Sequence, residues 1–294
     1  MAWESTLPVP VIINGRNHIP PPSVEAFETE FAGILPEGNN LPSSWGVTRF
    51  YDFSPDAKES ARRVLLIHGV GTSGIGMAPL ALRLKETGNH VIYDLWGYGL
   101  SSTPLTAHVP AIFHIQILEL LSYLKWSKAH LLGFSGDGAI AATFYVKPMT
   151  IEGWCGLYWL RRRTVLGFVL GNANKPKLDW TERLQKGEVD VVAVQLWERA
   201  HHKGHEKSVI SMFEGLSVDH DDKFTMLPKS GVEVLLILGE KDPAVQPDKI
   251  RKAFSNMEWH GDIHEIKRAG HDVVRPSVDE TARVINQFWA KLEF

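Results

Sequence analysis

The sequence predicts an α/β fold with a mostly parallel central sheet flanked by helices. From residue 47 onward, short apolar runs alternate with segments of helical periodicity, which is typical of βα units around a parallel sheet. Several runs are apolar throughout, as expected for strands covered on both faces. At 294 residues with 44% hydrophobic content, the chain is long enough to bury a large core. The predicted strands are VTRFYDF (47–53), RVLLIHG (63–69), HVIYDLWG (90–97), AHLLGFS (129–135), TVLGFVLG (164–171), VEVLLILG (232–239) and DIHEIKRAG (262–270).

The segments between these runs carry signals that begin and end helices. MAPLALRLKETG ends at Gly88, and PAIFHIQILELLSYLKW begins with Pro110, at the position where a helix favours proline. The last helix is predicted to begin at Ser277, which forms a capping box with Glu280. Its apolar positions repeat at helical spacing and are Ile285, Phe288, Trp289 and Leu292.

The chain divides into an irregular N-terminal arm (1–46), an α/β core (47–171 and 231–294) and a helical cap insertion (172–230). The arm is rich in Pro, Gly and Asn, and Pro20 to Pro22 disfavour regular helix. The cap is predicted because its helical patterns come without a strand signal. Residues 151–163 are aromatic and basic, have no clean period, and receive no structural assignment.

Composition excludes several classes of protein. The net charge is −3 and basic residues are scattered, so no nucleic-acid partner is expected, and Arg161 to Arg163 are interpreted as a solvated run. The single cysteine, Cys155, cannot form an internal disulfide, which favours a reducing compartment and a cytoplasmic location. The first residues do not resemble a signal peptide, and no window of about 18 residues is apolar and uncharged, so no transmembrane segment is expected. The oligomeric state is not indicated.

Residues 131–144, LLGFSGDGAIAATF, interrupt an apolar run with small residues before a helical pattern. A sharp strand-to-helix turn there explains the glycines and presents the hydroxyl of Ser135 above the sheet edge. A serine needs a base, an acid behind that base, and donors for the oxyanion. We expect these donors to be the amides of Gly136, at the helix start, and Val70, after the strand at 63–69.

Five motifs in order resemble the α/β-hydrolase superfamily, in its serine branch of esterases, lipases and lactonases, over about residues 47–294. They are LLIHGVG, DLWGYGLSSTP, GFSGDG, LLILGEKDP and RAGHD. The resemblance implies that the acid is Asp242 and the base is His271, in loops that follow the last two predicted strands. It also implies attack by Ser135, an acyl-enzyme, and deacylation by water.

The elbow departs from the family pattern G-x-S-x-G, because position 137 is Asp and the glycine is displaced to Gly138. A carboxylate where the helix packs against a strand costs space and desolvation, so Asp137 is a candidate for weakening catalysis. Alternatively, Ser135 is an ordinary helix N-cap.

The other assignments have alternatives too. Asp242 also fits a turn before Pro243, with Asp179 or Asp272 as substitutes for the acid, although Asp272 is poorly placed to reach the ring of its neighbour. His68 is expected to orient the oxyanion loop through hydrogen bonds.

No cofactor or metal is implied by the sequence. The segment GTSGIG (71–76) lacks the spacing of a nucleotide-binding loop. In HHKGH (201–205), His201 and His205 have a spacing that suits a metal on one helix face, but no partner ligand is recognisable and a solvated face is favoured.

The function predicted is hydrolysis of a small-molecule carboxylic ester or lactone with an apolar acyl or ring portion. A serine nucleophile argues against epoxide hydrolases and haloalkane dehalogenases, which need a carboxylate there. Two alternatives stay open: a carbon–carbon bond hydrolase or lyase on the same triad, and a non-catalytic hydrolase-like ligand-binding protein. The residues expected to contact substrate are Trp180, Trp197 and Phe134.

Overall fold

A computed structural model describes most of the chain, namely residues 12, 16–58, 60–135, 138, 140–141, 175–216, 226–256 and 261–292. The predicted strand at 164–171, the unassigned segment 151–163 and Cys155 lie outside these ranges.

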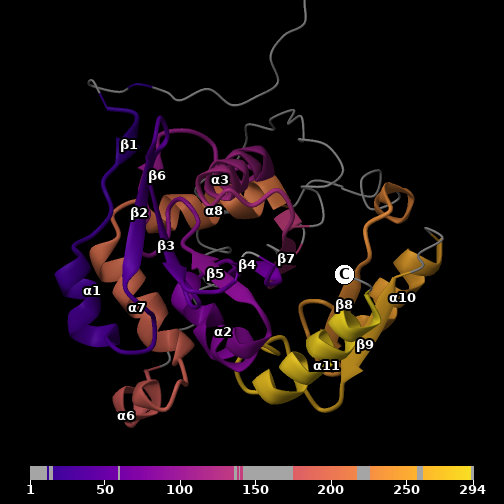
Figure 1. Cartoon of the computed structure of the whole chain (residues 1–294). Coiled ribbons are helices and arrows are strands. Elements are labelled where there is room, and N and C mark those ends of the chain that lie inside the picture. Colours follow the sequence, from indigo (N-terminus) through magenta and orange to yellow (C-terminus); the bar gives the residue numbers. More distant parts are fainter. Residues whose placement is uncertain are drawn as a thin grey trace, which may run out of the picture.

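Within these described ranges, the largest sheet has five strands in the order β2-β3-β5-β4-β7 (Figure 1). β4, β5 and β7 run parallel, and β3 and β2 continue the sheet in antiparallel fashion, which confirms the predicted mostly parallel arrangement at its centre. The register pairs Ile67 with both Tyr93 and Gly133, so the three parallel strands end at one edge. The strands are β2 Gly38–Ser43, β3 Gly46–Asp52, β4 Arg63–Ile67, β5 Asn89–Tyr93 and β7 His130–Gly133.

Helices cover both faces of this sheet, as the continuously apolar strands predict. Along β4, Val64 and Leu66 enter one hydrophobic cluster while Leu65 and Ile67 enter another, because successive side chains of a strand point to opposite faces. The first cluster includes residues of α2 (Ala78–Leu84), and the second includes residues of α3 (Pro110–Tyr123), with Pro110 at the first helical position.

In the described C-terminal residues, two parallel strands pair with each other, orange to yellow in Figure 1. These strands, β8 and β9, confirm the last two predicted strands. α10 follows β8, and α11 packs against α2, where the exposed pair Arg83–Asp279 spans 2.6 Å. The elements are β8 Leu235–Gly239, α10 Pro247–Asn256, β9 Asp262–Ile266 and α11 Val278–Lys291.

The capping box predicted for α11 is wrong, although the helix does begin after Ser277. The Ser277 side chain makes no capping hydrogen bond, because its backbone (φ −111°, ψ 24°) is not the extended conformation that aims a hydroxyl at the first-turn amides. Glu280 lies instead near His264 and Arg283, at 3.7 and 3.5 Å.

The N-terminal arm is ordered into regular elements over residues 16–46, so the expectation of an irregular arm does not hold there. α1 (Val24–Phe31) starts directly after the prolines, and the Ser23 hydroxyl accepts a hydrogen bond from the Ala26 amide. β2 pairs with β3 along its whole length, and the two-residue β1 (His18–Ile19) pairs with β6 (Thr103–Pro104).

The described part of the predicted cap consists of helices. Trp197 packs edge-on against Phe27 at 5.1 Å, and Trp180 contacts Phe31 at 5.5 Å, so aromatic contacts fasten the cap to α1. Figure 1 shows α6 and α7 beside α1. The cap elements are α6 Trp180–Gln185, α7 Val191–His201, α8 His205–Leu216 and the 3-10 helix η3 Leu227–Ser230.

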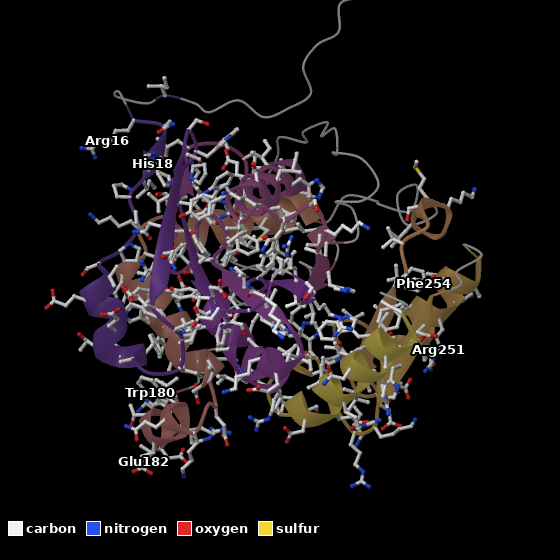
Figure 2. The ribbon with its side chains drawn as sticks, in the orientation of Figure 1. Arg16, His18, Trp180, Glu182, Arg251 and Phe254 are labelled. Carbon is white, nitrogen blue, oxygen red and sulfur yellow. The ribbon has the colours of Figure 1, made fainter. Side chains whose placement is uncertain are left out.

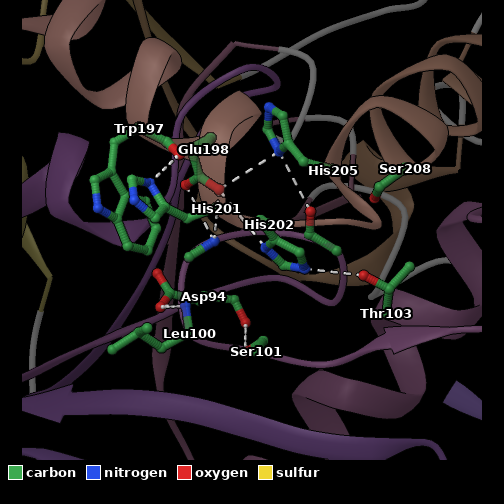
Figure 3. Close-up of polar contacts among 12 residues, drawn as sticks. Asp94, Leu100, Ser101, Thr103, Trp197, Glu198, His201, His202, His205 and Ser208 are labelled. Carbon is green, nitrogen blue, oxygen red and sulfur yellow. Dashed lines mark hydrogen bonds and ion pairs between the residues drawn. The ribbon is translucent and has the colours of Figure 1, made fainter. Parts of the chain in front are cut away.

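A buried ionic cluster joins the cap to the loop that follows β5 (Figure 3). Both carboxylate oxygens of Glu198 accept from the Gly99 amide at 3.1 Å. The Nδ1 atoms of His205 and His202 lie 3.5 and 3.7 Å from Glu198 Oε2, and His202 Nε2 lies 2.9 Å from Thr103 Oγ1. Burial opposes ionisation of Glu198, but the neighbouring imidazoles outweigh it and lower its pKa to about 2.

The solvated face predicted for HHKGH is therefore wrong for two of its histidines. α7 ends at His201, which is exposed, whereas His202 and His205 are buried at 3% and 0% exposure. Gly204 is needed between the helices, because a Cβ there would lie 2.0 Å from Thr103 Oγ1. The spacing of the histidines in the sequence does not reveal that one helix ends at His201 and the next begins at His205.

Replacing Glu198 by Ala is expected to destabilise the protein by about 3 kcal/mol, because it leaves the buried Gly99 amide without its acceptor and removes the negative charge beside two buried imidazoles. Urea unfolding monitored by tryptophan fluorescence measures this. The control is Glu182→Ala on α6, whose parent side chain is exposed, and it should change stability by less than about 0.5 kcal/mol. Equal effects of both variants would contradict a stabilising role for the cluster.

Stability is also expected to fall as the pH is lowered from 6.5 to 4.5. Removal from water lowers the pKa of four imidazoles from 6.5 to about 4, so between these values the unfolded chain binds more protons and acid favours unfolding. Burial raises the pKa of Asp94 to about 7 and also raises the pKa values of Asp52 and Glu119, which opposes this effect. Burial lowers the pKa of His205 as well, so the imidazoles outnumber these carboxyl groups. The four histidines are His68, His90, His108 and His130.

Urea midpoints measured at several pH values between 6.5 and 4.5 test this expectation. His108→Gln should flatten the profile, whereas His201→Gln, at an exposed position, should leave its slope unchanged. A urea midpoint that is constant or rises toward pH 4.5 would refute the expectation that buried neutral histidines lower stability in acid.

Candidate active site

Ser135 follows β7 in a strained turn, as the glycine-rich motif predicts. Its φ is +62°, in the left-handed region that a residue with a Cβ rarely adopts. The turn is closed by the Gly138 amide, which donates to the Ser135 carbonyl at 3.0 Å. A Cβ on Gly69 would lie 2.9 Å from Phe134 and 3.2 Å from Ser135 Cβ, so the loop after β4 packs directly on the elbow. The side chain of Ser135 is exposed at the edge where the parallel strands end.

The structure brings Ser135, His271 and Asp242 together in one hydrogen-bonded chain. Ser135 Oγ lies 2.7 Å from His271 Nε2, and His271 Nδ1 lies 2.8 Å from Asp242 Oδ2. The carboxylate can only accept, so Nδ1 carries the proton and Nε2 presents its lone pair to the serine. The side chain of Asp242 is 5% exposed and that of His271 is 33%, so the acid is buried behind a base that solvent reaches.

Two further contacts fix the acid and the base. The second oxygen of Asp242 accepts from the amides of Ala244 and Val245 at 2.8 and 2.9 Å, which orients the carboxylate. A Cβ on Gly239 would lie 2.0 Å from the Gly270 carbonyl oxygen, so only glycine lets the end of β8 approach the histidine loop this closely.

The alternatives for the acid are not brought to the imidazole in this way. The carboxylate of Asp272 lies 2.7 Å from Arg275, and Asp179 stands at the start of α6 in the cap.

His68 holds the loop after β4, as the sequence suggests. Its Nε2 accepts from the Leu95 amide at 3.0 Å, so Nδ1 carries the proton that is shared with the Gly69 carbonyl at 3.0 Å. Burial lowers the pKa of His68 to about 4, which keeps the ring neutral and suited to these two bonds near pH 7.

The two amides expected to bind an oxyanion stay predictions. Val70 lies in the loop between β4 and η1 (Gly74–Met77) and packs against the hydrophobic cluster around α3. Gly136 lies outside the described residues, and so does Asp137, the residue that departs from the family motif.

Asp94 is a site-supporting residue that sequence reasoning did not single out. It stands at the end of β5, and its carboxylate accepts from the amides of Gly74 and Leu100 at 2.8 and 2.9 Å. It thereby ties the first residue of η1, Gly74, which lies within the GTSGIG segment, to the loop after β5. The motif DLWGYGLSSTP contains this aspartate, but only the burial and the partners of its side chain indicate the role.

A cavity of about 850 Å³ lies between β7 and β8, and Ser135 is part of its wall. Ser135, His271 and Asp242 contribute to its wall, and the rest of the described lining is mainly apolar. The apolar residues come from β7, β8, α10 and α11 and include Leu132, Leu236, Leu238, Phe254, Ile285 and Phe288.

Of the three residues expected to contact substrate, Phe134 lines this cavity and the two tryptophans do not. Trp197 is 2% exposed, packs on α1, and donates its indole N–H to the Ala26 carbonyl at 3.2 Å. Trp180 lies at the opposite end of the molecule from Phe254, which is part of the cavity wall (Figure 2). Their placement does not support a role in substrate binding.

Within the described ranges, no group of three His, Cys, Asp or Glu side chains is arranged to hold a metal ion. The helices of the same residues include none that is long and apolar enough to cross a membrane.

The fold and the site agree with comparison to known families. The model of the alpha/beta hydrolase family matches residues 64–285, which is most of the chain. The protein belongs to the alpha/beta hydrolase family.

Solved structures of similar fold include several hydrolases at low identity. A carboxylesterase, CesB, from Bacillus subtilis is 16% identical with a TM-score of 0.67, over 92% of this chain and 97% of that one. An enol-lactonase from Burkholderia xenovorans is 17% identical with a TM-score of 0.63, over 86% and 100%. E-2-(acetamidomethylene)succinate hydrolase is 16% identical with a TM-score of 0.65, over 86% and 99%. Comparison with curated protein sequences found no match.

Proposed function

We propose that the protein is a serine hydrolase that cleaves a carboxylic ester or lactone with an apolar acyl or ring portion through an acyl-enzyme. The observation that carries this proposal is the chain of hydrogen bonds from Ser135 Oγ through His271 to Asp242, at 2.7 and 2.8 Å. A hydroxyl, a base and an orienting acid in this arrangement are the groups that acyl transfer to serine requires.

In the first half-reaction, Ser135 Oγ attacks the ester carbonyl and His271 Nε2 takes the hydroxyl proton. The tetrahedral intermediate collapses when the C–O bond to the leaving group breaks, and His271 gives its proton to that oxygen. In the second half-reaction, water attacks the acyl-enzyme with His271 again as the base, and Ser135 leaves with the proton. For a lactone, the alcohol stays attached to the acid product.

Asp242 acts through the imidazole. It holds the tautomer in which Nε2 is unprotonated, and it stabilises the imidazolium that forms when the serine proton moves. The amides of Ala244 and Val245 keep the carboxylate oriented for this task. The negative charge on the substrate oxygen is assigned to the amides of Val70 and Gly136, each of which is typically worth about 3 kcal/mol of transition-state stabilisation.

The mainly apolar lining of the cavity beside Ser135 supports an apolar acyl or ring portion, because burial of such a group needs no hydrogen-bond partners. Ester and lactone hydrolysis also agree with the carboxylesterase and the enol-lactonase among the similar structures. The single cysteine supports a reducing compartment, and a cytoplasmic location is proposed with it.

A fluorophosphonate probe is expected to label Ser135. The serine oxygen forms a bond to phosphorus, fluoride leaves, and His271 takes the proton, so labelling requires the serine and its base but no knowledge of the substrate. In Ser135→Ala labelling should be absent, and in His271→Ala it should slow by about 10³-fold or more. Gel fluorescence with peptide mass spectrometry of the adduct measures both.

The matched control is Ser255→Ala, which removes an exposed hydroxyl on α10 and should label like wild type. A folded wild-type protein that does not react would reject hydrolysis and favour the ligand-binding alternative. A labelled protein that cleaves none of a panel of esters and lactones would favour carbon–carbon bond chemistry on the same residues.

Asp242→Asn is expected to lower kcat for a p-nitrophenyl ester by about 10³- to 10⁴-fold while the protein stays folded. The amides of Ala244 and Val245 need an acceptor, so they hold the Asn carbonyl on their side and turn its NH₂ toward His271 Nδ1. That NH₂ is a donor, so the imidazole proton moves to Nε2 and no lone pair faces Ser135.

The control for this substitution is Asp248→Asn, an exposed position on α10. Its kcat should stay within about twofold of wild type. If Asp242→Asn retained full activity, the acid would have to be assigned elsewhere.

A further inference from the structure

Arg275 lies four residues after His271, in the loop between β9 and α11, and its side chain is buried to 9% exposure. A buried guanidinium needs partners, because burial of an unpaired charge is costly. Its Nε lies 2.7 Å from Asp272 Oδ2, within the same loop. Its Nη1 donates to the Gly76 carbonyl at 2.9 Å, across a sequence separation of 199 residues.

The guanidinium also packs on the elbow. Arg275 Cζ lies 5.2 Å from the centre of the Phe134 ring, which is a cation–π contact with the residue directly before Ser135. The same ring lies 5.5 Å from the imidazole of His271. One side chain therefore contacts the histidine loop, the elbow and η1, which follows the loop that carries Val70.

These contacts join loops that follow different strands. Ser135 follows β7, whereas His271 follows β9, 136 residues later in the chain. Contacts between the loops that carry these two residues help to set the distance between Ser135 Oγ and His271 Nε2. Arg275 supplies such a contact with two hydrogen bonds and a ring contact in fixed geometry.

We propose that Arg275 is a positioning residue, which sets the distance from His271 to Ser135 by fastening the histidine loop to the elbow and to η1. The proposal rests on the serine-hydrolase function proposed above. Arg275 is absent from the described wall of the cavity beside Ser135, so its effect is on the imidazole and not on ligand contact.

The test uses the labelling rate of the full-length protein with a fluorophosphonate, measured over a range of probe concentrations. Arg275→Ala is expected to lower the maximal rate by about 10- to 100-fold, since a displacement of about 1 Å at a reacting group has effects of this size. The probe concentration that gives half the maximal rate should change by less than about threefold, because the cavity wall is intact.

Three further measurements separate positioning from a general loss of structure. Guanidinium chloride at low millimolar concentration should restore part of the rate of Arg275→Ala, and Arg275→Lys should lie between that variant and wild type, because lysine keeps the charge but not the planar fork. Gly76→Ala disturbs the same hydrogen bond from the η1 side, because the new Cβ would lie 2.8 Å from Arg275 Nη1. This variant should lower the maximal labelling rate in the same way as Arg275→Ala.

The control is Arg251→Ala, which removes an arginine of the same C-terminal part, paired with Glu265 at 2.7 Å on the surface, and should label like wild type. If Arg275→Ala is poorly folded, the labelling rates of Gly76→Ala and Arg275→Lys are used to test the positioning role. Labelling of these folded variants at the wild-type rate would overturn the positioning role while leaving the proposed hydrolase intact. A rate loss that guanidinium and lysine do not relieve, with the same loss in Arg251→Ala, would also overturn it. Absence of labelling in wild type would reject the proposed function instead.

Discussion

The parallel register of β4, β5 and β7 is the constraint on which the arrangement of the site depends. Because Ile67 stands opposite both Tyr93 and Gly133, the loops that follow these strands leave the sheet side by side. The elbow packs against the loop after β4, and that loop is tied to the loop after β5 through Asp94. A shift of one residue in any pairing would turn the alternating side chains to the wrong face and would separate these loops.

Buried polar side chains also hold the loops that follow the parallel strands. Backbone amides in irregular loops need acceptors, and here they find carboxylates and an imidazole instead of a strand partner. The carboxylate of Asp94 accepts hydrogen bonds from the amides of Gly74 and Leu100. The imidazole of His68 accepts one from the Leu95 amide, and the carboxylate of Asp242 accepts two from amides of its own turn. These hydrogen bonds satisfy the loop amides where there is no regular secondary structure.

Local patterns in the sequence were sufficient for most of the strands and for the turn at Ser135, whereas Asp242 and His271 were implied by the family resemblance. Apolar runs indicate β4, β5, β8 and β9, and glycines at a strand end indicate the turn at Ser135, because each signal lies within a few neighbouring residues.

The failures involve contacts between distant segments. From the sequence alone, Trp197 is expected in a pocket, but in the structure it packs against Phe27. His205 is expected to be solvated, but Glu198 and the loop after β5 enclose it. α1 was missed because the prolines before Ser23 mask a short helix whose apolar residues face the cap.

The proposed site is assembled from segments far apart in the chain, and this has a consequence for how the proposed activity could be lost. The proposed acid and base are joined by a hydrogen bond, and the end of β8 approaches the histidine loop closely at Gly239 and Gly270, whereas Ser135 follows β7. A slight displacement of the loops that carry Asp242 and His271 relative to the elbow would leave an imidazole in the required tautomer with no hydroxyl within reach. Loss of the proposed activity and unfolding are then separate events. A protein that keeps all of its secondary structure can still be inactive.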